Sequence, residues 1–431
     1  MSRALVVLAL ALASSSCVTT KQIHEVRSPD PRDDEPELTA AEKAQIAEKH
    51  GQALAKANPL RTVININGKE PIVNVRVVFE AGSADDPAGK EGLAALTAAL
   101  MREATEKLSA AELADKLYPW AAELDVQVDK DTIAFIGRVH KDFANDFIAV
   151  LTDVIAHPRL APADFERKRA EKKAFLENNL RSSNDELLQR EELEASIYPA
   201  GHPYHHTPNG TVNGLAAITL DDVKDFIAQD LTRDRCVVGV SGGASLAVVA
   251  DLDKSIEALP FSNGPRAVPA VPALSDRNTA ILVDKPAAGS AISVGFALPE
   301  LSRTSPDYAA MKLAETWFGE HRQLNGHLFH SMREERGLNY GDYAYIEHFV
   351  QDRGSTFERL NIPRRTQYFS MWIRPVEHKN RLFALRQTLW ELEHFAADGI
   401  PDDAAFEGAK AFVQGYWRSK EQEPMRRLGY A

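Results

Sequence analysis

The feature that most constrains the fold is that one order of predicted elements occurs twice along the chain. In the first half, the strand-like run 62–67 and the alternating apolar run 73–79 lead through a turn-rich loop to a helical pattern from Gly92. In the second half, the corresponding elements are the predicted strands 279–284 and 291–298 and the helix 308–318. A strand, turn, strand, loop and helix in both halves predicts an internal duplication.

A proline-rich stretch separates the two copies, with four prolines from Pro260 to Pro272. We therefore predict an N-terminal domain at 59–258, a linker at 259–276 and a C-terminal domain at 277–431. A chain of 431 residues is long enough for two domains that each have a core. Strands followed by helix pairs, without regular βαβ alternation, predict the α+β class, with helices packed on an antiparallel-type sheet in each domain.

Two capping boxes mark predicted helix starts in the N-terminal domain. Ser109 stands three residues before Glu112, and Thr219 stands three residues before Asp222. A side-chain oxygen at the first position and a carboxylate at the fourth can satisfy free amides at the start of a helix. We expect helices to begin directly after Ser109 and Thr219.

The N-terminus has the pattern of an export signal. Arg3 precedes the apolar run 4–13, which is too short to span a bilayer as a mature helix. Small residues then lead to Cys17, and this junction looks like a bacterial lipoprotein cleavage site, which implies that residues 1–17 are a signal and Cys17 is lipidated. An ordinary secretory signal with an incidental cysteine is the alternative. The polar residues 18–58 suit a tether, so we expect a lipid-anchored protein of the cell envelope, at the outer membrane or its periplasmic face.

Charge and cysteine content exclude some classes of function. The chain has 62 acidic and 50 basic residues, a net charge of -12 and no block of Lys or Arg, which argues against a nucleic-acid partner. Cys236 lies in an apolar run and is interpreted as a buried core thiol. With Cys17 lipidated, no disulfide is available, so redox chemistry is not expected.

A charged helical turn in the second half runs into aromatic, strand-like residues. The turn breaks at Gly337, and the break would bring Arg333 and Tyr340, seven positions apart, near one point. A guanidinium and a phenol so placed can donate to a peptide carbonyl, but the segment contains no group that activates water. The alternative is a surface Arg333 paired with Glu334 and a half-buried strand tyrosine.

Short motifs spread over residues 60–431 carry a family resemblance. They are found at residues 81–86, 89–94, 165–167, 201–204, 210–211, 283–286, 306–308 and 333–340. Their order resembles the pitrilysin/insulinase-type metallopeptidase family, including its processing-peptidase relatives. The resemblance implies two related α+β domains that enclose a chamber with a companion pair of domains, and a peptide as substrate.

The family's metal-binding motif, His-x-x-Glu-His, is lost in this chain. Its two histidine positions fall on Ala95 and Ala99 and its general base falls on Ala98, and alanine offers neither a metal ligand nor a proton acceptor. The family's further glutamate ligand aligns with Phe175, although Glu177 is close by. We expect no metal or other cofactor in this chain.

The second-half motif is kept. In the family, an arginine and a tyrosine at the spacing of Arg333 and Tyr340 reach across to the zinc site and bind the substrate carbonyl. The resemblance therefore implies a non-catalytic subunit of a heterodimeric zinc endopeptidase, whose motif-bearing homologous partner supplies zinc. The alternatives are a peptide-binding or assembly scaffold, and a chain that hydrolyses peptides alone through an unrecognised metal site.

Two histidine groups and the end of the chain complete the predictions. His202, His205 and His206 lie in a loop, and His327 and His330 share a helix face with no evident carboxylate partner. Both groups are interpreted as structural, with metal binding as the alternative. Because the family's second domain continues to a last strand, we expect the C-terminal domain either to be truncated at Ala431 or to be completed by the partner.

Overall fold

The computed structural model describes most of the chain after the predicted tether. The described residues are 60–262, 266–267, 269–270, 272, 278–298, 301–351, 359 and 363–430. The predicted signal, Cys17 and the whole predicted tether, 18–58, lie outside them. Among the described residues, no helix combines the length and the apolar content that crossing a membrane requires.

The N-terminal domain is built on a five-stranded sheet in the order β1-β5-β2-β4-β3. Its strands are β1 (Arg61–Ile66), β2 (Ile72–Phe79), β3 (Glu123–Val128), β4 (Ile133–His140) and β5 (Cys236–Gly242). β1 and β5 are parallel, and the other neighbours are antiparallel. The central strand β2 follows the predicted alternation, because Val73, Val75 and Val77 are fully buried in the core while Asn74 and Arg76 alternate with them.

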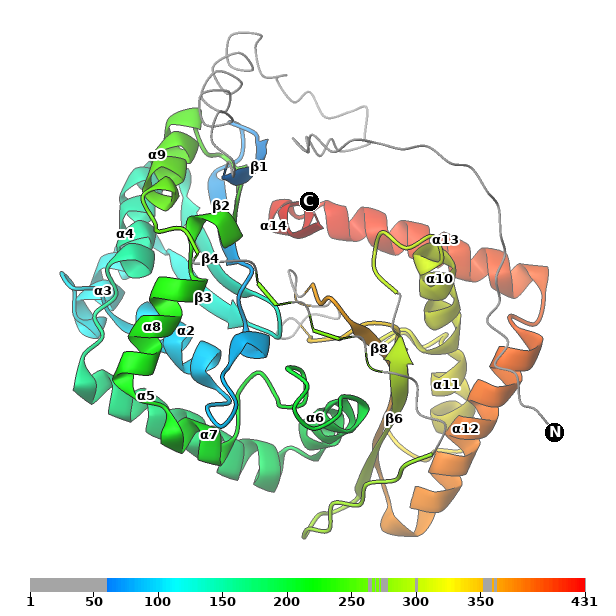
Figure 1. Ribbon diagram of the computed structural model, residues 1–431. Helices are drawn as coiled ribbons and strands as arrows, with labels where there is room; N and C mark the ends of the chain where they lie inside the picture. Colours follow the sequence, from blue (N-terminus) through cyan, green and yellow to red (C-terminus); the bar gives the residue numbers. More distant parts are fainter. Residues whose placement is uncertain are drawn as a thin grey trace.

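Helices cover the core face of this sheet (Figure 1). They are α2 (Leu93–Glu103), α3 (Ala110–Leu117), α4 (Ala144–Ala156), α5 (Pro162–Ala174), α7 (Val212–Ala217), α8 (Leu220–Asp230) and α9 (Leu246–Glu257). Both predicted capping boxes are confirmed at the starts of α3 and α8. α5 passes into a π-helical segment, Phe175–Ser183, which is followed by α6 (Asp185–Ile197).

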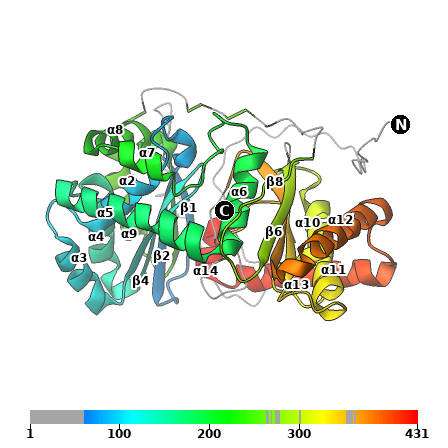
Figure 2. The same ribbon diagram turned by 90° about the horizontal axis from the view of Figure 1, so that it is seen from below.

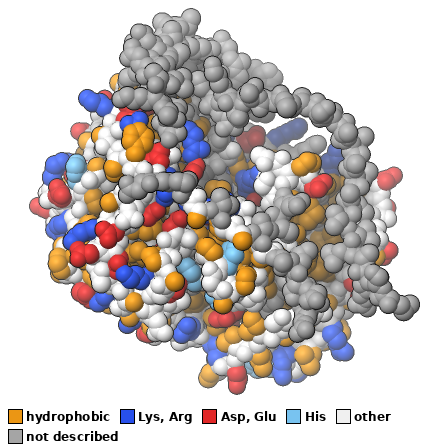
Figure 3. Space-filling model, in the orientation of Figure 1, with side chains coloured by type: hydrophobic (Ala, Val, Ile, Leu, Met, Phe, Trp, Pro, Cys, Tyr) orange, Lys and Arg blue, Asp and Glu red, His pale blue; other side chains and the backbone are white. Residues whose placement is uncertain are grey.

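The face of the N-terminal domain seen in Figure 3 mixes basic and acidic side chains. On α5, charges pair within the helix or with its neighbours. Arg167 bonds Glu171 at 2.8 Å, and Lys168 lies 2.8 Å from Glu103 of α2. The Arg167–Glu171 pair is exposed and contributes little to stability, whereas Lys168 and Glu103 are half-buried.

The C-terminal domain has a three-stranded antiparallel sheet in the order β6-β8-β7, with helices on one face (Figure 2). Its strands are β6 (Ser290–Leu298), β7 (Asp342–Tyr345) and β8 (Gln367–Val376). Its helices are α10 (Tyr308–Gly319), α11 (His327–Phe329), α12 (Arg381–Asp398), α13 (Asp403–Glu421) and α14 (Pro424–Tyr430). The architecture therefore matches the predicted α+β class with two related domains.

The duplication is visible in the order of elements. β2, α2, β3, β4, α4 and α5 of the first domain correspond to β6, α10, β7, β8, α12 and α13 of the second. A short 3-10 turn even follows both β4 and β8, at Lys141–Phe143 and His378–Asn380. The predicted strand 279–284 is wrong, because these residues pair with no described strand and Leu282 is 88% exposed.

Each domain contributes one helix that packs on the sheet of the other domain. α6 of the first domain packs on β6 and β8, and its Leu193 lies against Gly295. α14 of the second domain packs on β5, β1 and β2. A Cβ atom at Gly239 of β5 would lie only 2.9 Å from the Leu428 side chain of α14, so the glycine leaves room for this leucine. The two domains are therefore joined by reciprocal contacts on the faces opposite their helical layers.

A buried ionic network also joins the domains. Arg364 donates to both carboxylate oxygens of Asp129, at 2.6 and 2.8 Å, and lies 3.0 Å from Glu194. Lys130 lies 3.0 Å from the other oxygen of Glu194. Burial would raise the pKa of Asp129, but the Arg364 guanidinium and His348 hold that pKa below its usual value. No local sequence pattern indicates that these groups, which are far apart along the chain, lie together in the fold.

Candidate functional site

The segment that carries Arg333 is a short helical turn held at its end by a glycine. A π-helical stretch, His330–Glu334, continues α11, and Gly337 adopts a left-handed φ of +58°. The amides of Gly337 and Leu338 donate back to the carbonyls of Arg333 and Met332, at 2.8 and 3.1 Å. Glycine takes this conformation without steric cost, so the helix ends here as the sequence indicates.

The structure brings Arg333 and Tyr340 together. The guanidinium carbon of Arg333 lies 4.8 Å from the centre of the Tyr340 ring and 4.7 Å from that of Phe329, within cation–π range. Tyr340 is 72% exposed, and Arg333 forms no hydrogen bond or ion pair with any described residue. The N–H groups of Arg333 and the phenol of Tyr340 are therefore open to a ligand.

A buried carboxylate supports the turn from below. Glu391 of α12 accepts a hydrogen bond from Ser331 and lies 2.7 Å from Nε2 of His327. Burial would raise the pKa of Glu391, but hydrogen bonds from Ser331, His327 and Gln387 hold it below its usual value. The prediction that the helix face of His327 and His330 has no carboxylate partner was wrong, because His330 lies 2.7 Å from Glu334, one turn later. The partner of His327 comes from a helix about sixty residues later in the chain.

The loop that presents Tyr340 is fixed by Asn339. Its amide donates to Asp342 at 2.7 Å and to the carbonyl of Arg374 at 3.0 Å, and it accepts from the amide of Gly341 at 3.2 Å. A side chain at Gly341 would overlap the hydroxyl of Tyr343, so this position favours glycine. Burial raises the pKa of Asp342 to about 7.

The degenerate metal motif lies in the N-terminal domain, on α2. Ala95 and Ala98 are buried and Ala99 is half-buried, so this stretch of the helix is used for packing. Asp86 accepts from the amides of Gly92 and Ala94 at the start of the helix, at 2.7 and 2.8 Å, and burial raises its pKa to about 8.

The residues at the motif do not fit a zinc ion. Alanine has no lone pair to offer, Phe175 is half-buried against the core, and Glu177 is exposed on the π-helical segment. Among the described residues, no group of three or more His, Cys, Asp or Glu side chains is arranged to hold a metal. These positions therefore lack the ligands that a metal-dependent step would need.

The loop histidines bond protein groups. His202 and His205 lie 2.7 Å from the carbonyls of Ala270 and Tyr198, respectively. His206 lies 4.0 Å from Asp86, and burial lowers its pKa to about 4. These contacts agree with the structural interpretation of the loop.

The fold and site define a two-domain, metallopeptidase-like α+β protein whose motif positions hold alanine. Two family models match it: insulinase (peptidase family M16) over residues 61–203, and the peptidase M16 inactive domain over residues 217–411. The chain belongs to the insulinase-type (M16) family and is a non-catalytic member of it. This confirms the resemblance found in the sequence.

Relatives and solved structures agree with this assignment. An uncharacterized zinc protease of Streptomyces coelicolor is 23% identical over 75% of this chain and 67% of its own length. The mitochondrial-processing peptidase subunit beta of Dictyostelium discoideum is 20% identical over 58% and 53%. A peptidase M16 inactive domain from Pseudomonas fluorescens shares the fold, with a TM-score of 0.71 and 21% identity over 82% of this chain and 81% of that one.

Proposed function

We propose that this chain is the non-catalytic, substrate-binding subunit of a heterodimeric insulinase-type zinc endopeptidase that acts on peptides. Its partner would be a homologous subunit with an intact His-x-x-Glu-His motif, which supplies the metal and the general base. The observation that carries the proposal is the adjacency of Arg333 and Tyr340, with the guanidinium of Arg333 free of hydrogen-bonding and ion-pair partners among the described residues.

The chemistry of the pair supports a role at a carbonyl. A guanidinium offers several N–H donors and a phenol offers one O–H donor, so both can point at a single oxygen. Negative charge grows on that oxygen as a peptide bond is attacked, and each preorganised donor can lower the barrier by about 3 kcal/mol. The supports from Glu391 and Asn339 keep the two donors in place before substrate arrives.

Reconstitution tests the proposal. The purified chain should contain no stoichiometric zinc by elemental analysis and should not hydrolyse peptides. Mixing it with a motif-bearing relative from the same cell should produce hydrolysis that chelators abolish. Stoichiometric zinc together with chelator-sensitive hydrolysis by this chain alone would overturn the proposal.

An assembly or peptide-binding scaffold is the second candidate. One structure with the same fold comes from complex III2 of Candida albicans, with a TM-score of 0.64 and 15% identity over 86% of this chain and 82% of that one. Copurification from native membranes separates the candidates. A peptidase subunit should bring down a protein with an intact metal motif, whereas a scaffold should not.

We also propose that Cys17 carries a lipid that anchors the chain to the cell envelope, at the outer membrane or its periplasmic face. The sequence around Cys17 is the support for this part. Cys17→Ser should abolish labelling by a radioactive fatty acid and release the protein from membranes. Unchanged labelling and membrane association would contradict it.

A further inference from the structure

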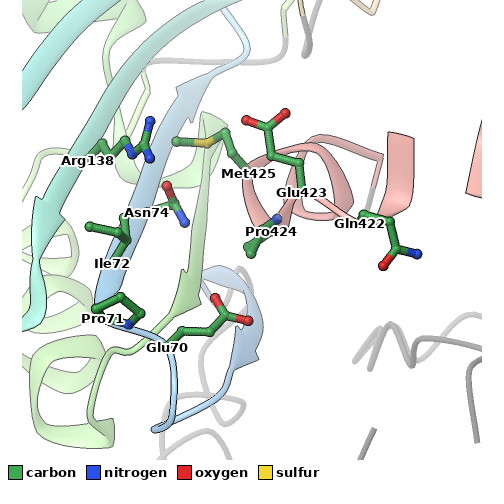
Figure 4. Close-up of a pocket in the computed structure, with 9 residues that line it drawn as sticks. All are labelled: Glu70, Pro71, Ile72, Asn74, Arg138, Gln422, Glu423, Pro424 and Met425. Carbon is green, nitrogen blue, oxygen red and sulfur yellow. The ribbon is translucent and has the colours of Figure 1, made fainter. Parts of the chain in front are cut away.

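A cavity of about 320 Å³ lies where α14 meets the open face of the N-terminal sheet (Figure 4). It is separate from the Arg333–Tyr340 pair and is lined by residues of both domains. They are Glu70, Pro71, Ile72, Asn74, Arg138, Gln422, Glu423, Pro424 and Met425. Its size is at the lower end of the range for small-ligand sites, about 300–1,000 Å³.

Strand register builds one wall of the cavity. Asn74 of β2 stands opposite Arg138 of β4 on one side and Ser241 of β5 on the other, so the three side chains form a polar row across the sheet. Ser241 donates to the carbonyl of Pro424 at 3.2 Å, which fixes the start of α14 over the row. Asn74 is only 4% exposed, and it borders the cavity next to Arg138 (Figure 4).

The charges in the cavity leave one guanidinium uncompensated. Glu423 is paired with Arg426 at 2.9 Å, and Glu70 lies 3.7 Å from Arg427. Arg138 forms no hydrogen bond or ion pair with any described residue. A free guanidinium beside an amide is suited to a carboxylate, which is planar and accepts two parallel N–H bonds.

The remaining walls favour an amphipathic ligand. Ile72 and Pro71 line one side of the cavity, and Pro424 and Met425 line the other. These apolar surfaces can hold an aliphatic side chain close to the carboxylate site. The carboxylates of Glu70 and Glu423 at the same site repel a dianion such as phosphate more strongly than a singly charged carboxylate, because the repulsion grows with the charge of the ligand.

We propose that this cavity binds the C-terminal residue of a peptide. The terminal carboxylate pairs with Arg138 and Asn74, and an apolar last side chain packs between Ile72 and Met425. Because the ligand is a peptide, the inference rests on the substrate-binding role proposed above. It requires neither the Arg333–Tyr340 pair nor a metal-bearing partner, so it can fail independently of that role.

Fluorescence anisotropy on the full chain alone tests the proposal. The probe is a fluorescein-labelled pentapeptide that ends in Ala-Leu, with either a free C-terminal carboxylate or a C-terminal amide. We expect the free acid to bind at least about tenfold more tightly than the amide, since a charge-assisted bond is lost in the amide. Equal affinity for the two peptides, or no binding of either, would overturn the proposal.

Variants of the lining residues test whether the preference for the free acid arises in the cavity. Arg138→Gln should reduce the preference for the acid to about twofold or less, whereas Arg181→Gln, at an exposed arginine on the π-helical segment, should leave it unchanged. Glu423→Gln removes a repelling charge and should tighten binding of the acid about twofold, a gain that a misfolded protein would not show. An unchanged preference in Arg138→Gln, or weaker binding in Glu423→Gln, would contradict the assignment.

Discussion

The two domains share an order of elements but use the corresponding regions differently. In the N-terminal domain, the helix after the first shared strand, α2, places Ala95, Ala98 and Ala99 at the motif positions and contributes to the core. In the C-terminal domain, the region after α10 keeps Arg333 and Tyr340 beside each other, with the phenol ring exposed. One copy packs in the core, and the other leaves a guanidinium and a phenol accessible.

Under the proposed function, loss of the metal motif has left the rest of the site in place. A helix whose polar positions become alanine remains a stable packing element, since alanine favours helices and leaves no buried polar group unpaired. A retained donor pair needs support, and Glu391 and Asn339 supply it in the C-terminal domain. The difference therefore favours a substrate-binding role over a metal-binding one.

Disrupting the buried ionic network between the domains should have the largest effect on stability. Arg364→Ala leaves Asp129 and Glu194 buried without their shared cation, and removing one partner of a buried pair costs about 3–5 kcal/mol. Urea unfolding measures this loss. Arg61→Ala, at an exposed pair with Glu80, should cost less than about 1 kcal/mol, and a similar loss in both variants would contradict the role of the network.

The second largest effect that we expect is a pH dependence of stability that arises in the C-terminal domain. The pKa of Asp342 rises from 3.8 to about 7 on folding, so ionising this buried carboxyl costs stability as pH rises through that window. Asp342→Asn should therefore be more stable than the natural chain at pH 8, by at most about 4 kcal/mol, and should converge with it near pH 4.

Thermal or urea unfolding across pH 4–8 measures this difference. Asp221→Asn, at an exposed carboxylate paired with Lys224, is the matched control and should follow the natural chain. Parallel curves for Asp342→Asn and the natural chain would show that Asp342 titrates normally.

Weakening the contacts that hold the turn of Arg333 and Tyr340 should have a smaller effect on stability. Glu391→Gln weakens the bonds to Ser331 and His327 and should destabilise the turn by about 1–2 kcal/mol. Hydrogen exchange of residues 327–341 should quicken in this variant. Glu393→Gln, an exposed glutamate on the same helix, should leave exchange unchanged, and no difference between the two would remove Glu391 from the account.

Local patterns predicted much of the fold. The alternation of Val73, Val75 and Val77 identified a strand, although β2 is buried on both faces instead of one. Two capping boxes marked helix starts that the structure confirms. The run 279–284 has the same apolar character, but it forms no strand among the described residues. A strand needs a neighbour, and local sequence does not reveal whether one is available.

The site was predictable where its residues are close in sequence. Arg333 and Tyr340 are joined by one turn, so a glycine break was enough to place them together. The support from Glu391 was not predictable, since this residue comes from a distant helix. The cavity beside Arg138 was missed for the same reason, because it forms only when α14 lies on the other domain's sheet.

The most direct test of the central claim is the rate of peptide hydrolysis when Tyr340→Phe is mixed with the motif-bearing partner. Loss of one preorganised donor should lower kcat by about 10²-fold or more while the two chains still associate. Tyr118→Phe, at a tyrosine that is 86% exposed in the N-terminal domain, should leave the rate unchanged. An unchanged kcat in Tyr340→Phe would contradict the account.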